Sequence, residues 1–170
     1  MVPIIRSQDN MGGSMKEEYV WFFAYGSAMN STRLAGRGVK FYSIEPAYIE
    51  KYQLKFNKRS VDGTAKANIV PATDSKVYGL LYKLPKSELH KLDNIEGLTS
   101  GHYYRTTLQV TTPSGEVFMA EVYMANAKYL VDDEKAFPSE QHISTVFNAA
   151  VKHKLDPDYI NYLRSFQELS

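Results

Sequence analysis

Four apolar residues in a row, Trp21 to Ala24, are followed at once by Tyr25-Gly26-Ser27. The length of the run does not distinguish a buried strand from a buried helix, but its aromatic residues and the glycine that ends it favour a strand. Because Gly26 has no Cβ, the backbone there can turn sharply or approach a ligand closely. The pattern therefore predicts either a ligand-binding loop with backbone N–H groups free to donate, or an ordinary first strand with a tight turn.

Alternating or continuous apolar segments predict further strands along the chain. With the first strand and its turn at 20–27, the expected strands are 42–50, 52–56, 66–71, 77–84, 103–111 and 117–124. Pro46 makes the segment 42–50 an edge strand or a loop, and Pro71 is expected to stop the strand before it. Asp62-Gly63 and residues 113–115 are expected to form turns.

Apolar residues at helical spacing predict three helices, and residues 28–40 form a loop with one helical turn at most. The first helix starts at Pro85 and ends near 94–97, the second covers 139–150, and Asp156-Pro157 begins the last one. Six or seven strands, mostly joined as hairpins, with a few helices indicate an α+β domain. We expect a small mixed, mostly antiparallel six- or seven-stranded β-barrel flanked by helices.

The bulk properties limit the class of protein. With 170 residues, one domain is expected, which we place at 19–170, after a disordered leader or cloning remnant at 1–18. Met15 is an equally credible natural start. There is no cysteine, so disulfides and thiolate chemistry are excluded, and the formal net charge of +1 gives no strong attraction to nucleic acid or membranes.

The same properties set expectations for location and partners. No apolar run reaches the ~20 residues of a membrane span, and Val2-Pro3-Ile4-Ile5 is too short for a signal peptide. We expect a cytoplasmic monomer or homodimer that binds no nucleic acid and no membrane. The basic stretch Lys51, Lys55, Lys58, Arg59 and Lys66 has aromatic neighbours and is interpreted as a solvated face, with contact to an anion or RNA as the alternative.

Candidate chemistry centres on one acid. Glu96 lies between Ile95 and Gly97, in the predicted loop from a helix to a strand. A carboxylate held among apolar neighbours has a raised pKa and can move protons near neutral pH, whereas an ordinary surface glutamate at a helix end has no such role. The histidines, among them His102 and His142, lack metal-ligand spacing, so we expect no metal.

Two segments together resemble the gamma-glutamylcyclotransferase-like (AIG2-like) family. Residues 23–27, Phe-Ala-Tyr-Gly-Ser, resemble the family's first motif, and residues 92–103 resemble its second, about 70 residues further on. A strand led by Gly79 precedes the second motif, as in the family. The first motif alone is weakly specific, but the two motifs in order are strongly specific, and the likeness covers residues 19–165.

The resemblance implies a function and a site. The family cleaves a gamma-glutamyl amide by attack of the substrate's own alpha-amine on its gamma-carbonyl, which releases 5-oxoproline and an amino acid or amine without a cofactor. Carried over by motif, Glu96 is the catalytic acid/base. The implied residues that bind the gamma-glutamyl substrate are Phe22, Tyr25, Gly26, Ser27, Tyr123 and His142. From charge alone, Arg59 or Arg105 is expected to pair with the substrate's alpha-carboxylate.

Two positions depart from the family pattern. The family usually has asparagine after Tyr-Gly-Ser, where this chain has Ala28, and His142 aligns with a tyrosine of some members. Two alternatives therefore stay open beside the main expectation. One is a cyclotransferase for gamma-glutamylamines, and the other is a module of the same fold that binds a gamma-glutamyl group or another small molecule without chemistry.

Overall fold

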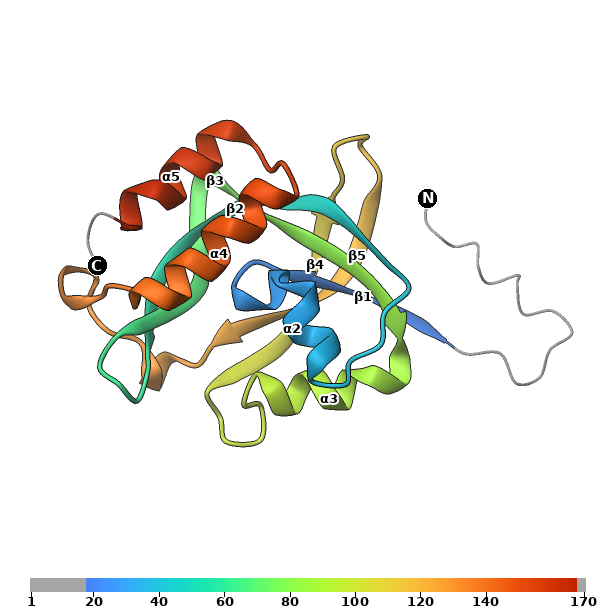
Figure 1. The fold of residues 1–170 in the computed structure, drawn as a ribbon, viewed down its shortest axis with the longest axis horizontal. Helices are drawn as coiled ribbons and strands as arrows, with labels where there is room; N and C mark the ends of the chain where they lie inside the picture. Colours follow the sequence, from blue (N-terminus) through green and yellow to red (C-terminus); the bar gives the residue numbers. More distant parts are fainter. Residues whose placement is uncertain (1–17, 168–170) are drawn as a thin grey trace, which may run out of the picture.

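Five strands close into one barrel in a computed structural model that describes residues 18–167 (Figure 1). The order around the barrel is β1-β3-β2-β4-β5. The strands are β1 (Tyr19–Ala24), β2 (Ser43–Arg59), β3 (Ala65–Pro85), β4 (Tyr103–Thr111) and β5 (Val117–Ala125). Neighbours are antiparallel except β1 and β5, which run parallel where Phe22 pairs with Glu121. The leader expected at 1–18 lies, apart from Glu18, outside the described residues.

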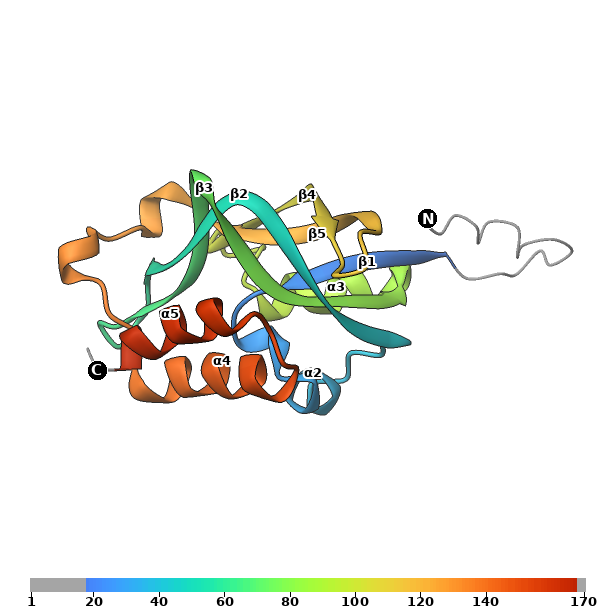
Figure 2. The ribbon, with the colours of Figure 1, turned by 90° about the horizontal axis from the view of Figure 1, so that it is seen from above.

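The expected mixed, mostly antiparallel barrel is confirmed, but the expected number of strands is wrong. Two predicted pairs of short strands are each one long, bent strand, β2 and β3 (Figure 2). Lys51 has a φ of 68°, and the register shifts between Glu50 and Tyr52, so a bulge bends β2 without ending it. Pro71 pairs with Tyr52 beside this bulge, where a strand tolerates a residue without an N–H, so β3 does not stop there.

Gly79 allows β1 and β3 to lie unusually close to each other. A Cβ at this position would lie 2.2 Å from the carbonyl oxygen of Ala24 and 2.9 Å from the ring of Phe23. Both neighbours are at the end of β1 and are buried in the core. The glycine therefore fixes the position from which the chain turns out of the barrel at Tyr25.

Helices cover the barrel on the outside. They are α2 (Ser31–Gly36), α3 (Leu89–Ile95), α4 (Glu140–Lys152) and α5 (Pro157–Gln167), with 3-10 turns η2 (Ser27–Met29), η3 (Lys86–Glu88), η4 (Ala127–Tyr129) and η5 (Asp133–Lys135). Figure 2 shows α2, α4 and α5 along one side of the barrel. None of the helices within residues 18–167 is long and apolar enough to cross a membrane.

The predicted starts of the two C-terminal helices agree with the structure, whereas the predicted start of the helix in the middle of the chain does not. Ser139 caps α4 by accepting a bond from the His142 N–H at 3.1 Å, and the Asp156 carboxylate accepts from two N–H groups at the start of α5. Pro85, expected to begin the first helix, is instead the last residue of β3, and η3 separates it from α3.

The connection from β5 to α4 was not predicted to have structure, and it lies against the ends of β2 and β3. The Val131 N–H donates to the Asn57 carbonyl at 2.9 Å, and the Ala65 N–H donates to the Phe137 carbonyl at 2.9 Å. These bonds attach the connection to the ends of β2 and β3. The last residues of β2 are thereby enclosed, Asn57 and Lys58 among them.

Candidate active site

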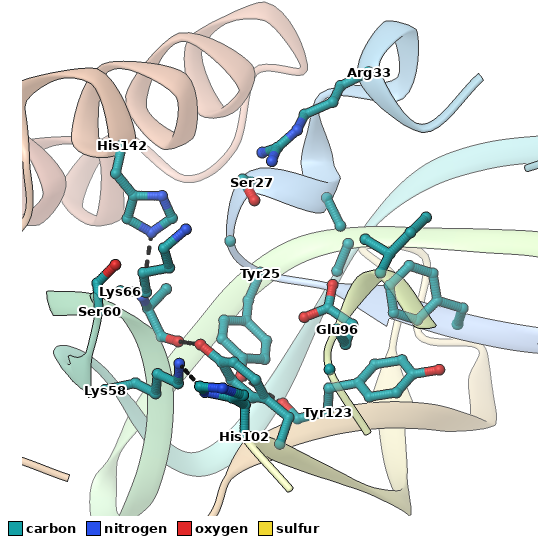
Figure 3. A pocket seen from close by; sticks show the side chains of 18 of the residues that line it. Tyr25, Ser27, Arg33, Lys58, Ser60, Lys66, Glu96, His102, Tyr123 and His142 are labelled. Carbon is teal, nitrogen blue, oxygen red and sulfur yellow. Dashed lines mark hydrogen bonds between the residues drawn. The ribbon is translucent and has the colours of Figure 1, made fainter. Parts of the chain in front are cut away.

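One cavity of about 300 Å³ brings the two sequence motifs together (Figure 3). Its wall is built by the end of β1, the bend after it, α2, the turn between β2 and β3, the end of α3, and residues of β4, β5 and α4. All the site residues expected from the family resemblance line it: Phe22, Tyr25, Gly26, Ser27, Glu96, Tyr123 and His142. These residues therefore lie together around one cavity, and their chemical roles stay predictions.

The bend after β1 presents backbone N–H groups that are free to donate. Its carbonyls accept bonds within η2, from Met29 N to Gly26 O and from Asn30 N to Ser27 O, each at 3.0 Å. The N–H groups of Gly26, Ser27 and Ala28 donate to no acceptor in the part of the chain that the structure describes. A Cβ on Gly26 would lie 3.2 Å from the Cβ of Ala67, so the bend packs tightly against β3.

The loop is supported although Ala28 replaces the asparagine usual in the family. The buried Tyr82 hydroxyl donates to the Ala28 carbonyl at 2.7 Å. Two residues later the Asn30 side chain accepts from the Arg33 N–H at 3.1 Å and caps α2. These two contacts hold the bend from both sides.

Glu96 is placed by the C-terminal end of α3. The Gly97 N–H donates to the Asn94 carbonyl at 3.2 Å, and the Leu98 N–H donates to the Asp93 carbonyl at 2.9 Å. This is the Schellman arrangement, in which the residue after the cap adopts a left-handed conformation, and Gly97 has a φ of 71°. Glycine at 97 therefore ends the helix and turns the preceding residue, Glu96, toward the cavity.

Burial makes Glu96 a weak acid. Removal from water raises the pKa of its carboxyl from 4.5 to about 7, and the positive charges of Arg33, Lys66, Arg37 and Lys58 only partly oppose this shift. No hydrogen bond reaches its carboxyl oxygens from the rest of residues 18–167. Near neutral pH this group is therefore divided between its acid and base forms, as a group that both takes and returns a proton must be.

Two tyrosines brace the floor of the cavity. The Tyr25 hydroxyl donates to the Tyr123 carbonyl at 2.5 Å, and the Tyr123 hydroxyl donates to Asp93 at 2.6 Å. Arg105 continues the network by pairing with Asp93 at 3.0 Å and with Glu121 at 2.9 Å. Figure 3 shows the Tyr123 hydroxyl pointing away from Glu96, so Tyr123 contributes its ring and backbone to the cavity.

His142 is held in its neutral form. Its Nε2 accepts a bond from the Ala67 N–H at 3.2 Å, which is possible only when that nitrogen carries no proton. Burial lowers the pKa of His142 to about 4, with the nearby charges of Lys66 and Arg33 acting in the same direction. The side chain therefore joins α4 to β3 at the edge of the cavity.

Neither arginine that the sequence suggested for the substrate's alpha-carboxylate lines the cavity. Arg59 donates to the Lys128 carbonyl at 3.5 Å and Arg105 is paired with two acids, and neither lines the cavity. The cations that do line it are Arg33, Arg37, Lys58 and Lys66. No local signal marked Lys58, because the predicted strand ended at residue 56 and the register of β2 shifts between Phe56 and Lys58.

Tyr103, Tyr104 and His102 lie differently with respect to the cavity. Tyr103 lines the cavity, but its hydroxyl donates to the Ala67 carbonyl at 2.8 Å, and Tyr104 is exposed outside it. His102 also lines the cavity, with its ring stacked on Tyr129. Within residues 18–167 no three metal-ligating side chains come together.

The fold and the cavity together define a class of protein, namely a small closed barrel in which a half-buried carboxyl group and a bend with free N–H groups share one cavity. The chain belongs to the AIG2-like family, whose model matches residues 76–163. The match includes Glu96 and the helices α4 and α5 up to Leu163.

Curated relatives and solved structures agree with this family. The chain is 27% identical over 157 residues to a gamma-glutamylcyclotransferase of Homo sapiens, which covers 89% of this chain and 80% of the relative. It is 27% identical over 170 residues to a gamma-glutamylcyclotransferase of Bos taurus, which covers 96% and 83%. A solved structure of a gamma-glutamyl cyclotransferase superposes with a TM-score of 0.75 at 26% identity, and 88% of each chain is covered.

Proposed function

We propose that this protein is a gamma-glutamyl cyclotransferase, an enzyme that releases 5-oxoproline and an amino acid or amine from a gamma-glutamyl amide. The observation that carries the proposal is the pairing in one cavity of Glu96, with a pKa of about 7, and the free N–H groups of residues 26–28. The names of the relatives, human and bovine, support the same reaction.

The first step is removal of a proton from the substrate's alpha-ammonium group. An alpha-amine has a pKa near 8, so a base with a pKa of about 7 accepts this proton at a cost of only about 1.4 kcal/mol. A glutamate with its ordinary pKa would make the transfer more costly by roughly 3 kcal/mol. The raised pKa of the half-buried Glu96 therefore suits it to act as the general base.

The second step is attack of the freed amine nitrogen on the gamma-carbonyl carbon of the same molecule. The new C–N bond closes a five-membered ring, and the carbonyl oxygen becomes an oxyanion, which the N–H groups of Gly26 and Ser27 are placed to bind. One good donor of this kind contributes roughly 3–4 kcal/mol. The role of the cavity is to hold the glutamyl chain folded back on itself.

The third step breaks the original amide bond. The protonated Glu96 returns its proton to the leaving nitrogen, the oxyanion collapses to a carbonyl, and the leaving amine departs with both electrons of the C–N bond. The ring nitrogen, which still carries two hydrogens and a positive charge, gives up one proton through Glu96, and this proton leaves on the released amine as an ammonium group. Atoms and charges balance without water or a cofactor, and Glu96 is regenerated as a carboxylate.

The test is release of 5-oxoproline from a panel of gamma-glutamyl amino acids and gamma-glutamylamines by the parent and by Glu96→Gln. We expect turnover by the parent and a loss of about 10²–10⁴-fold in kcat for the variant. Turnover of both proteins at the same rate would show that Glu96 is not the acid/base. Tight binding of the substrates by the parent with no product would instead favour a non-catalytic binding module.

A further inference from the structure

Lys58 is a buried cation without an acidic partner. It lies on β2, it is 5% exposed, and no carboxylate of residues 18–167 forms an ion pair with it. Its closest polar contact is neutral, since the Nδ1 of His102 lies 2.7 Å from the ammonium nitrogen. Burying an unpaired charge is unfavourable, so a site that retains one is a candidate for binding an ion of opposite sign.

The surroundings of Lys58 hold the ammonium group in place and leave donors free. His102 Nδ1 accepts one of its three N–H bonds, and the rings of Tyr103 and Tyr129 lie 5.5 and 5.2 Å away. His102 is itself fixed, because its ring stacks on Tyr129 at 4.2 Å. Two N–H groups of Lys58 therefore have no acceptor within the described chain.

The position of Lys58 separates it from the other cations that line the cavity. Arg33, Arg37 and Lys66 are exposed, whereas Lys58 is enclosed by the connection after β5. Figure 3 shows Arg33 on one side of the cavity and Lys58 with His102 on the other, apart from Glu96. An enclosed charge binds a ligand in one geometry and is screened little by salt, so it suits the part of a substrate that never varies.

We propose that the ammonium group of Lys58 binds the alpha-carboxylate of the gamma-glutamyl group. The glutamyl part has one anionic group, and it is common to every gamma-glutamyl substrate, whereas the leaving group varies. The exposed arginines then lie where the leaving group enters. This assignment rests on the proposed function, and it replaces Arg59 and Arg105 as the expected partner of that carboxylate.

The test compares the loss of each partner. Lys58→Met keeps the length and volume of the side chain, and substrates with a 4-aminobutanoyl group in place of gamma-glutamyl lack the alpha-carboxylate and cyclise to 2-pyrrolidinone. We expect Lys58→Met to raise KM for a gamma-glutamyl amino acid by about 10- to 100-fold. We expect the KM of the parent to be higher by a similar factor for the 4-aminobutanoyl analogue than for the gamma-glutamyl substrate. The variant is expected to discriminate little between the two.

Calorimetry of 5-oxoproline and 2-pyrrolidinone provides a readout without turnover. The parent should bind 5-oxoproline more tightly, and Lys58→Met should abolish this difference, while Lys152→Met on the outside of α4 changes neither binding nor KM. Melting curves confirm that the variants are folded.

If the parent cyclises gamma-glutamyl substrates and Lys58→Met leaves KM and binding within twofold, or lowers kcat alone, the Lys58 assignment is wrong and the proposed function stands. If the parent forms no 5-oxoproline but Lys58→Met weakens its binding, the function is wrong and the carboxylate site stands.

Discussion

At the scale of single residues, the raised pKa of Glu96 affects both its ability to transfer protons and the stability of the folded protein. Its pKa is 4.5 in an unfolded chain and about 7 in the folded protein, so between these values the folded state binds the proton more tightly. Stability is therefore highest below pH 4.5 with respect to this group and falls as the pH rises toward 7. Desolvation of the Glu96 carboxyl raises its pKa, which makes it a useful base. The same desolvation makes the ionised form of Glu96 lower the stability of the folded protein.

We expect Glu96→Gln to be more stable than the parent at pH 8 and no more stable at pH 4. Because the group faces an open cavity, the gain is about 1–3 kcal/mol rather than the full value of the pKa shift. Urea unfolding of both proteins at the two pH values measures it. A gain that is equal at both pH values would contradict a raised pKa for Glu96.

The activity of the parent should depend on pH through the same group. The carboxylate is the form that accepts a proton, so kcat/KM is expected to rise with pH up to an apparent pKa near 7 and then to level off until another group titrates. Initial rates of 5-oxoproline release between pH 5 and 8 measure this limb. A rate that is constant over this range would exclude Glu96 as the base.

Ser27 offers a milder test of the bend. Its backbone N–H, rather than its hydroxyl, is assigned to the oxyanion, so Ser27→Ala should keep the main interaction. We expect a KM raised by a few fold and kcat within about tenfold of the parent. A loss as large as that of Glu96→Gln would show that the hydroxyl takes part in the chemistry.

At the scale of elements, the close contact of β1 and β3 sets the position of the bend. Gly79→Ala would place a Cβ 2.2 Å from a backbone oxygen, and neither strand can move without moving the barrel. We expect a loss of about 2–4 kcal/mol in the free energy of unfolding, measured in urea. Gly36→Ala in α2 is the matched control, because nothing lies within 4 Å of a Cβ there, and it should be neutral or stabilising.

The elements themselves were predictable to different degrees. The strand 103–111 agrees with β4 at both ends, and the two C-terminal helices begin at the predicted caps, because alternation, spacing and capping are local signals. The long strands were split in the prediction at Lys51 and at Pro71. Whether a bulge or a proline ends a strand depends on the partner strand, which local sequence does not reveal.

At the scale of the whole molecule, the charge is nearly balanced, but the lining of the cavity is net positive. The sequence carries a formal net charge of +1, yet four cations and one acid, Glu96, line the cavity. Three of those cations are exposed at its mouth: Arg33, Arg37 and Lys66. Such a mouth attracts a leaving group with a negative charge more than a neutral or cationic amine.

We therefore expect gamma-glutamyl amino acids to be cleaved with a kcat/KM about tenfold higher than gamma-glutamylamines of similar size. Salt screens ion pairs between exposed groups, so this preference should shrink as NaCl is raised from 50 to 500 mM. Over this range the screening length falls from roughly 14 to 4 Å. Initial rates on matched substrates, with and without the leaving-group carboxylate, measure it. Equal rates at low salt would contradict this role for the mouth.

The sequence by itself determined the local elements, the two motifs and the residues that share the site, because strand period, helix caps and the glycines at 26 and 97 act over a few neighbouring positions. Only the tertiary structure decided which strands merge, how the barrel closes, and that Lys58 is enclosed while Arg59 and Arg105 lie outside the cavity. It also decided the raised pKa of Glu96, since burial is a property of everything packed around a group and not of its neighbours in the chain.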